Sequence, residues 1–212
     1  MIVTAVERQR RRVKVFIDGR FALAVGLELA VERDIRPGRS LTNEDLSALA
    51  EAEARRRALE FALRLLSYRP RSEREIRDRL KRRWFSRPVI NGTVDRLREL
   101  GYVDDAAFAR YWAESRQALR PQSGRLLAVE LRRQGVDKET VLQATADISE
   151  EDAAYEAAAR RLKALRGLER QPFRERLGRF LTRRGFAYDV ARRTIERCWA
   201  ELEDRRPDNS AK

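Results

Sequence analysis

The first 25 residues alternate between apolar and polar positions, a pattern typical of β-strands. Residues 13–17 (VKVFI) and 20–25 (RFALAV) flank the dipeptide Asp18-Gly19. Asp-Gly between two such runs is a strong hairpin signal, because a type I′ turn needs positive φ at both central residues. With residues 2–7 (IVTAVE) in front, the pattern predicts a three-strand β-meander over residues 1–26. A sheet this small needs a helix to pack against.

The apolar spacing changes from that of strands to that of helices after the meander. Residues 27–33 (LELAVER) form a candidate helix inside a helical connector that we place at residues 27–52. Thr42, followed three residues later by Asp45, resembles a helix cap. Residues 44–67 contain no Gly or Pro and carry leucines near helical spacing.

A hexapeptide then recurs three times, at intervals of 51 and 50 residues: LKRRWF from Leu80, LRRQGV from Leu131 and LTRRGF from Leu181. Four positions before each leucine lies another apolar residue, which the helical period places on the same face. The predicted repeat core comprises Ile76, Leu80, Leu127, Leu131, Leu177 and Leu181. A proline precedes each leucine by nine or ten residues and indicates a helix start, where proline is tolerated. Such a period predicts a repeat architecture.

Each copy has the order helix, proline, helix, short turn, helix. We place three-helix repeats at residues 53–103, 104–149 and 150–206, and a polar, disordered tail at residues 207–212. Joints as short as GYVDD at residues 101–105 favour a curved array in which each repeat contacts its neighbours. The predicted fold class is mainly α: three tandem three-helix repeats forming a curved array, preceded by a small N-terminal three-strand β-meander.

The charge of the chain is unevenly distributed. The formal net charge is +13, and 42 of the 47 basic residues are arginine. Arginine suits phosphate binding, although a GC-rich genome explains the same bias. Repeats 1 and 3 are basic, whereas residues 104–152 carry seven basic and ten acidic side chains. This distribution favours anionic contacts at the outer repeats and a protein contact between them.

A basic pair stands just before a helix end in every copy. The pairs are Arg82 with Arg83, Arg132 with Arg133, and Arg183 with Arg184. They either stabilise helix C-termini through the helix dipole or contact phosphates or carboxylates of a partner. Gly135 and Gly185 follow the second and third pairs, where a helix end needs left-handed φ. The first copy has Trp84 there, so we expect a different turn in repeat 1.

Three aromatic residues of the helical region have two possible roles. Trp84, Trp112 and Tyr111 either stack on nucleic-acid bases or, as helical aromatics usually do, belong to the core. The single cysteine, Cys198, lies beside Trp199 on an apolar helix face and is expected to be a buried structural thiol. One cysteine excludes an internal disulfide and a multi-cysteine zinc site.

The motifs that enzymes need are absent. The chain contains no histidine, no phosphate-binding loop and no dinucleotide-binding glycine motif. Its paired acids lie at helix starts, where they act as caps. We therefore expect no catalytic residues, no metal and no cofactor. No apolar run reaches the roughly 18 residues that a membrane span needs, and the N-terminus lacks a signal-peptide pattern. We expect a cytoplasmic protein without membrane contact.

Residues 101–116 (GYVDDAAFARYWAESR) carry a resemblance to a known family. They match the pattern G-[YF]-[ILV]-[DN]-D-x-x-[FY]-A of the RecX family of bacterial recombination regulators. The family's helix ending E-L-x-x-[KR]-G-[IV] is matched by residues 130–136, except that Gln134 replaces the usual basic residue. Residues 183–189 (RRGFAYD) resemble its third-repeat ending. The resemblance covers about residues 55–203.

This resemblance implies a non-enzymatic regulator. Members of the family bind RecA, lie in the groove of the RecA–DNA filament and usually inhibit its ATPase, strand-exchange and coprotease activities. The implied partners are the RecA filament and the single- or double-stranded DNA within it, and we expect a monomer. The six paired arginines are the candidate contact residues.

Two other classes of function remain open at this point. One is an independent nucleic-acid-binding protein of tandem helix-turn-helix-like units, such as a transcription regulator, for which Asn91 is a candidate base-reading residue. The other is a protein-interaction scaffold whose charge only keeps it in solution.

Overall fold

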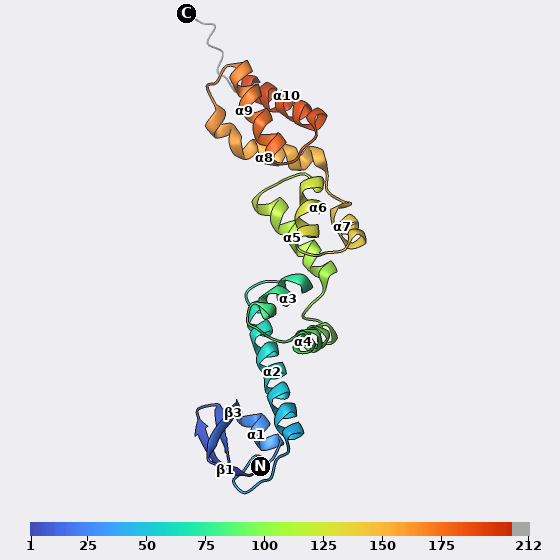
Figure 1. Ribbon diagram of the computed structural model, residues 1–212. Helices are drawn as coiled ribbons and strands as arrows, with labels where there is room; N and C mark the ends of the chain where they lie inside the picture. The colour runs from blue at the N-terminus through green and yellow to red at the C-terminus, as the bar shows by residue number, and fades with distance from the viewer. Residues whose placement is uncertain (205–212) are drawn as a thin grey trace, which may run out of the picture. The chain divides into compact units, whose positions relative to one another are not determined.

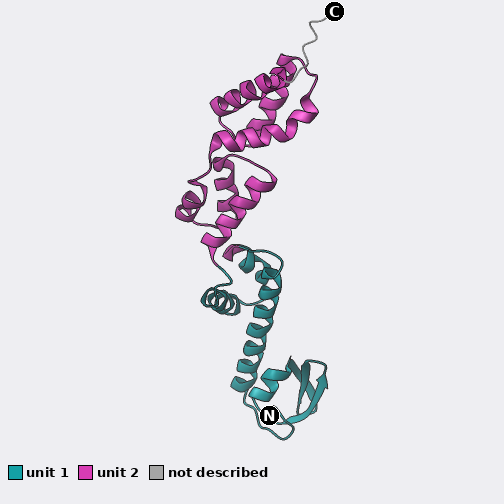
Figure 2. Ribbon diagram, turned by 180° about the vertical axis from the view of Figure 1, so that it is seen from behind, with its two compact units in different colours: residues 1–71, 75–103 teal, residues 72–74, 104–212 magenta. Residues whose placement is uncertain are grey.

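The computed structural model describes residues 1–204, a three-strand sheet followed by ten helices within that range (Figure 1). The expected tail at residues 207–212 lies outside the described residues. The chain divides into two compact units (Figure 2). The first comprises Met1–Arg71 and Glu75–Val103, and the second comprises Ser72–Arg74 and the chain from Asp104 onward. The mainly helical fold with an N-terminal sheet confirms the predicted fold class.

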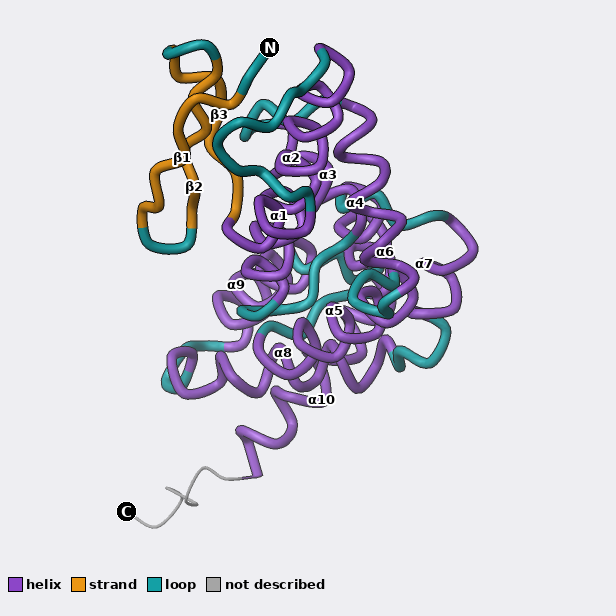
Figure 3. The backbone as a smooth tube through the Cα atoms, turned by 90° about the horizontal axis from the view of Figure 1, so that it is seen from below, coloured by secondary structure: helices purple, strands orange, loops and turns teal. Residues whose placement is uncertain are grey.

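The sheet is an antiparallel meander in the order β1-β2-β3, drawn in orange in Figure 3. Its strands are β1 (Val3–Gln9), β2 (Arg12–Ile17) and β3 (Arg20–Gly26). Asp18 and Gly19 have φ of 48° and 77°, as the predicted hairpin turn requires. One face of the sheet contributes Val3, Val15 and Val25, all fully buried, to a core shared with the neighbouring helices.

The sheet core is closed by α1 (Leu27–Glu32) and by the first half of α2 (Asn43–Leu66). The α2 helix starts with a capping box, because Thr42 accepts from the backbone of Asp45 and the Asp45 carboxylate accepts from the backbone of Thr42. It then runs without interruption through residues 52 and 53, where we placed a domain boundary.

The second half of α2 belongs to the core of repeat 1. Its residues from Ala54 onward pack with α3 (Glu73–Lys81) and α4 (Arg87–Glu99). Ala58 and Ala62 are fully buried there, whereas Leu49 in the first half packs on the sheet. One helix thus serves two cores in turn, which is why no linker separates the meander from repeat 1.

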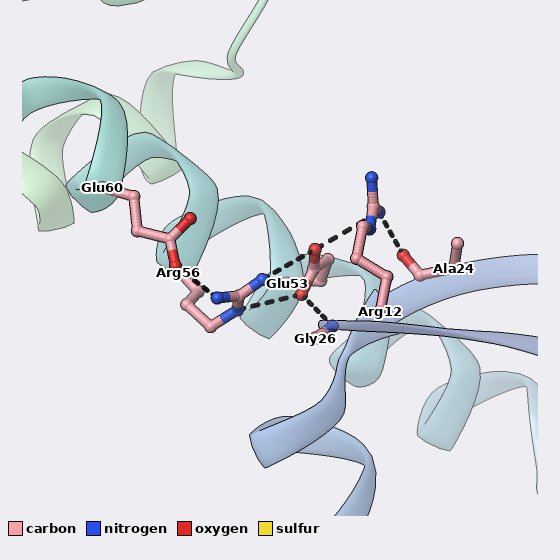
Figure 4. A network of polar contacts seen from close by, with 6 residues as sticks. All are labelled: Arg12, Ala24, Gly26, Glu53, Arg56 and Glu60. Carbon is pink, nitrogen blue, oxygen red and sulfur yellow. Dashed lines mark hydrogen bonds and ion pairs between the residues drawn. The ribbon is translucent and has the colours of Figure 1, made fainter. Parts of the chain in front are cut away.

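A buried carboxylate joins the sheet to α2 at the point where the two cores meet (Figure 4). Glu53 is 5% exposed and accepts a 2.9 Å hydrogen bond from the backbone N–H of Gly26. The guanidinium groups of Arg12 and Arg56 lie 3.4 and 3.2 Å from the same carboxylate. Arg12 also donates to the carbonyl oxygen of Ala24 at 2.7 Å. These contacts satisfy a charge that would otherwise be costly to bury.

The second unit holds two further three-helix repeats. Repeat 2 consists of α5 (Asp105–Leu119), α6 (Gly124–Arg133) and α7 (Lys138–Thr145). Repeat 3 consists of α8 (Glu150–Leu165), α9 (Arg170–Arg183) and α10 (Tyr188–Asp204). Side chains cap four of these helices: Asp104, Ser123, Asp137 and Ser149 each accept from a backbone N–H two or three residues ahead.

Each repeat has its own core. All six leucine and isoleucine side chains of the recurring motif are 0% exposed: Ile76, Leu80, Leu127, Leu131, Leu177 and Leu181. They lie in three separate clusters, one for each repeat. Cys198 is likewise fully buried, in the cluster of repeat 3, which confirms the expected structural thiol. Burial raises the pKa of this thiol to about 11.

Candidate binding residues at the helix ends

The turn that follows the recurring leucine has the same backbone geometry in all three repeats. Trp84, Gly135 and Gly185 have φ of 62°, 90° and 84°. Their backbone N–H groups donate to Lys81, Arg132 and Thr182 at 2.9, 3.0 and 2.9 Å. The next N–H in each repeat donates to the carbonyl of the recurring leucine. The expectation of a different turn in repeat 1 is therefore wrong: Trp84 adopts the left-handed conformation that glycine adopts in the other copies.

This shared turn corrects the alignment of the basic pairs. Counting back from Trp84, Gly135 and Gly185, Arg82 corresponds to Arg133 and Arg183, which we call the outer position. The inner position, one residue later, is occupied by Arg83, Gln134 and Arg184. Arg132 corresponds to Lys81 and Thr182. The three pairs are thus not equivalent, because the pair of repeat 2 lies one residue earlier.

The outer position is exposed to solvent in every repeat. The two arginines at the inner position contact other residues of the folded protein. The Arg83 guanidinium lies 4.9 Å from the ring centre of Phe61. The Arg184 guanidinium lies 5.0 Å from the ring centre of Phe180 and donates to the carbonyl of Pro121 at 3.0 Å. An arginine used in this way stabilises the fold as well as carrying charge.

Arg184 also lies in a concentration of positive charge. Burial lowers the pKa of its guanidinium, and the neighbouring Arg120, Arg161 and Arg160 lower it further by repulsion. Arginines in this number create a positive potential that attracts anions. Arg120, which follows α5 of the acidic repeat, thus lies in a basic cluster contributed mainly by repeat 3.

Comparable pairs of hydrogen bonds form at two joints within the second unit, although the serine donates through its hydroxyl at one and through its backbone N–H at the other. The Ser72 hydroxyl donates to the carbonyl of Gln134 at 2.7 Å, and the backbone N–H of Glu73 donates to Asp105 at 2.8 Å. One repeat later, the backbone N–H of Ser123 donates to the carbonyl of Arg184 at 3.0 Å, and that of Gly124 donates to Glu150 at 2.7 Å. In repeat 2, these bonds thus fix the start of α6 on the turn and the first helix of repeat 3.

The close approach at these joints explains the glycines. A Cβ atom on Gly185 would lie 2.8 Å from the Cβ of Leu126, and one on Gly135 would lie 2.5 Å from the Cβ of Arg74. Both turns therefore exclude side chains. The sequence signal for these joints was the serine that stands eight residues before Leu80 and Leu131, but its long-range partners cannot be read from local spacing.

The three aromatic residues considered for stacking differ in their environment. Trp84 is 94% exposed. Trp112 packs against the core of repeat 2, and its indole N–H donates to Glu130 at 3.0 Å. Tyr111 is 39% exposed. Trp84 is therefore by far the most exposed of the three.

Asn91, the candidate base-reading residue, contacts another residue of repeat 1. The side-chain oxygen of Asn91 accepts from Arg77 at 2.7 Å, which commits it to a contact within repeat 1. Within residues 1–204, no cluster of three or more side chains that could bind a metal ion is found. In the same range, no helix combines the length and the apolarity that crossing a membrane requires. A groove of about 460 Å³ lies between α9 and α10, and its lining includes Phe173, Ile195 and Trp199.

The fold and the helix-end geometry define a class of protein, in which three-helix domains repeat in tandem. Family models identify the family. Residues 58–97 match the first three-helix domain of RecX, residues 104–144 the second and residues 149–195 the third. The chain belongs to the RecX family, whose curated members are named regulatory proteins.

The relatives span almost the whole chain. Regulatory protein RecX of Thermobifida fusca (strain YX) is 39% identical over 183 residues, which cover 83% of this chain and 95% of that protein. The regulatory protein RecX of Bacillus subtilis (strain 168) is 28% identical over 208 residues, which cover 95% and 79%. The meander and the connector are thus part of what is shared with such relatives.

Solved structures share the fold. A crystal structure of regulatory protein RecX superposes with a TM-score of 0.66 at 19% identity, covering 96% of this chain and 98% of that one. The crystal structure of RecX from Lactobacillus salivarius superposes with a TM-score of 0.58 at 18% identity, covering 72% and 98%.

Proposed function

We propose that this protein binds the RecA–DNA filament and inhibits the ATPase, strand-exchange and coprotease activities of RecA. The observation that carries the proposal is the match of all three repeats to RecX domain models, in a family of regulatory proteins. The protein acts by binding, without catalysis of its own, as a monomer in the cytoplasm.

The distribution of charge supports a partner that contains DNA. Exposed cations occupy the outer position in the two basic repeats, at Arg82 and Arg183. Arg184 and its arginine neighbours add a positive field in repeat 3. Phosphates of a filament's DNA are the polyanion that such surfaces attract. Repeat 2, which has an excess of acidic residues, is the part suited to contact with protein.

The test is the rate of DNA-dependent ATP hydrolysis by the cognate RecA on single-stranded DNA. We expect the rate to fall as this protein is added and to reach a plateau at saturation. A charge-reversal variant of the outer position, Arg82→Glu with Arg183→Glu, should need a higher concentration for the same inhibition. No change in rate at saturating protein would reject the proposal and favour an independent nucleic-acid-binding protein.

A further inference from the structure

The stability of the fold does not explain why residue 84 is a tryptophan. Its backbone is left-handed, with φ of 62°, in a turn where the other repeats use glycine. The backbone of a residue other than glycine is strained in this conformation. The ring is 94% exposed, so it contributes almost nothing to a core. Both the backbone and the side chain would be more stable with glycine at this position, and neither burial nor packing compensates.

The surroundings of Trp84 are strongly basic. Between residues 76 and 94 the chain has six cations and one acid, Asp78. Lys81, Arg82 and Arg87 are exposed, and within residues 1–204 no carboxylate lies at ion-pair distance from any of them. Their charge is therefore free to meet an anionic partner.

An exposed aromatic ring among unpaired cations is the arrangement with which proteins bind single-stranded nucleic acid. Bases stack on the ring while cations contact the phosphates. Duplex DNA keeps its bases stacked inside, so a single protruding ring suits unpaired bases. A membrane surface would need a wider apolar face, but the next residue, Phe85, packs against the core of repeat 1.

We infer that Trp84 stacks on an unpaired base of single-stranded DNA, with Lys81, Arg82 and Arg87 contacting the adjacent phosphates. This goes beyond the proposed function, because it assigns the chain its own contact with bases. It is tested without RecA, so its failure leaves the regulatory proposal standing.

The experiment compares two labelled strands of equal length and charge, an oligothymidylate and the same backbone with abasic sites, by fluorescence anisotropy at low salt. The full-length protein should bind the oligothymidylate about 5- to 150-fold more tightly, the range that one stacked base supplies. Trp84→Gly should bind the two strands equally. Trp84→Phe should keep most of the preference, because it retains a ring.

The Trp84→Gly variant is expected to melt at or above the temperature of the original protein, since glycine suits the turn. If it fails to fold, Trp84→Asn serves instead, because asparagine tolerates left-handed φ. Tyr68→Ser, which removes another exposed ring of the same unit, is the matched control and should keep the preference.

Three results would overturn the inference: no binding of the original protein to either strand, equal affinity for both strands, or a preference that survives in Trp84→Gly.

Discussion

The backbone N–H of Ser123 donates a 3.0 Å hydrogen bond to the carbonyl oxygen of Arg184, and this bond fixes the start of α6 on the end of α9. The bond is possible because residue 185 is glycine. A Cβ atom there would lie 2.8 Å from the Cβ of Leu126, inside normal contact distance. The packing of repeat 2 on repeat 3 therefore depends on a missing side chain.

Replacing Gly185 with alanine should destabilise the second unit by more than the strain of a left-handed alanine backbone alone. The matched control is Gly167→Ala, because Gly167 has φ of 83° and open space around it, whereas Gly185 has φ of 84° and close neighbours. Both variants bear the left-handed strain of about 1–2 kcal/mol. Gly185→Ala should cost about 1–3 kcal/mol more through overpacking. Urea unfolding measures both effects. Equal midpoints would show that the joint can open without loss of stability.

Local sequence patterns predicted the strands and helices better than the correspondence and the contacts between the repeats. Asp18-Gly19 predicted the hairpin because a two-residue turn is decided by its own φ angles. The recurring leucines predicted the repeat helices because burial follows helical periodicity. The alignment of the basic pairs went wrong in repeat 2, because adjacent arginines were matched to each other instead of to the left-handed residue that ends the helix.

The joints and the exposure of Trp84 could not be predicted in the same way. The partner of Ser72 is the carbonyl of Gln134, 62 residues away, and such a bond depends on tertiary packing. The sequence placed Trp84 among residues that are usually core. Only the three-dimensional structure shows that it takes the glycine position of a turn and points its ring to solvent.

Leu131→Ala tests the core of repeat 2. Leu131 is 0% exposed in a cluster with Phe108, Leu127 and Val141, so truncation leaves a cavity. We expect a loss of about 2–5 kcal/mol in the free energy of unfolding. Leu119→Ala is the control, because this leucine is 78% exposed and should change stability by less than about 0.5 kcal/mol. Similar urea midpoints for the two variants would contradict the core assignment.

Glu53→Leu tests the junction between the sheet and α2. The substitution removes the acceptor of the buried Gly26 N–H and should cost about 1–3 kcal/mol. Glu60→Leu removes the exposed partner of Arg56 and should cost less than about 1 kcal/mol. Amide hydrogen exchange in β3 would report the difference. If exchange in β3 stays as slow in Glu53→Leu as in the original protein, the carboxylate does not hold this junction.

Cys198 should be unreactive in the folded protein. Burial removes it from solvent and raises its pKa to about 11, so very little reactive thiolate is present at pH 8. A thiol reagent is expected to label it only when urea unfolds repeat 3, and the rate of labelling then reports unfolding. Rapid labelling of the native protein at pH 8 would show that the helix α10 opens or that the thiol is accessible.

The outer arginines provide the sharpest test of the proposed contact with the filament. Arg82, Arg133 and Arg183 share one backbone position and are all exposed, so their effects on helix stability should be alike. They differ in electrostatic setting, because Arg133 lies in the repeat that has an excess of acidic residues. Helix-end stabilisation predicts the same small effect for all three, whereas phosphate contact predicts a difference.

We expect Arg82→Ala and Arg183→Ala to weaken binding to RecA filaments on single-stranded DNA. Each lost phosphate contact should reduce the slope of log K against log salt by about 0.7. Arg133→Ala should leave that slope unchanged. Arg184→Ala should in addition lower the stability of the folded protein, because this side chain donates a hydrogen bond to the carbonyl of Pro121. Binding across a salt series gives the slopes, and far-ultraviolet circular dichroism checks that each variant folds. Equal slopes for all four variants would mean that these arginines stabilise helix ends and do not contact DNA phosphates.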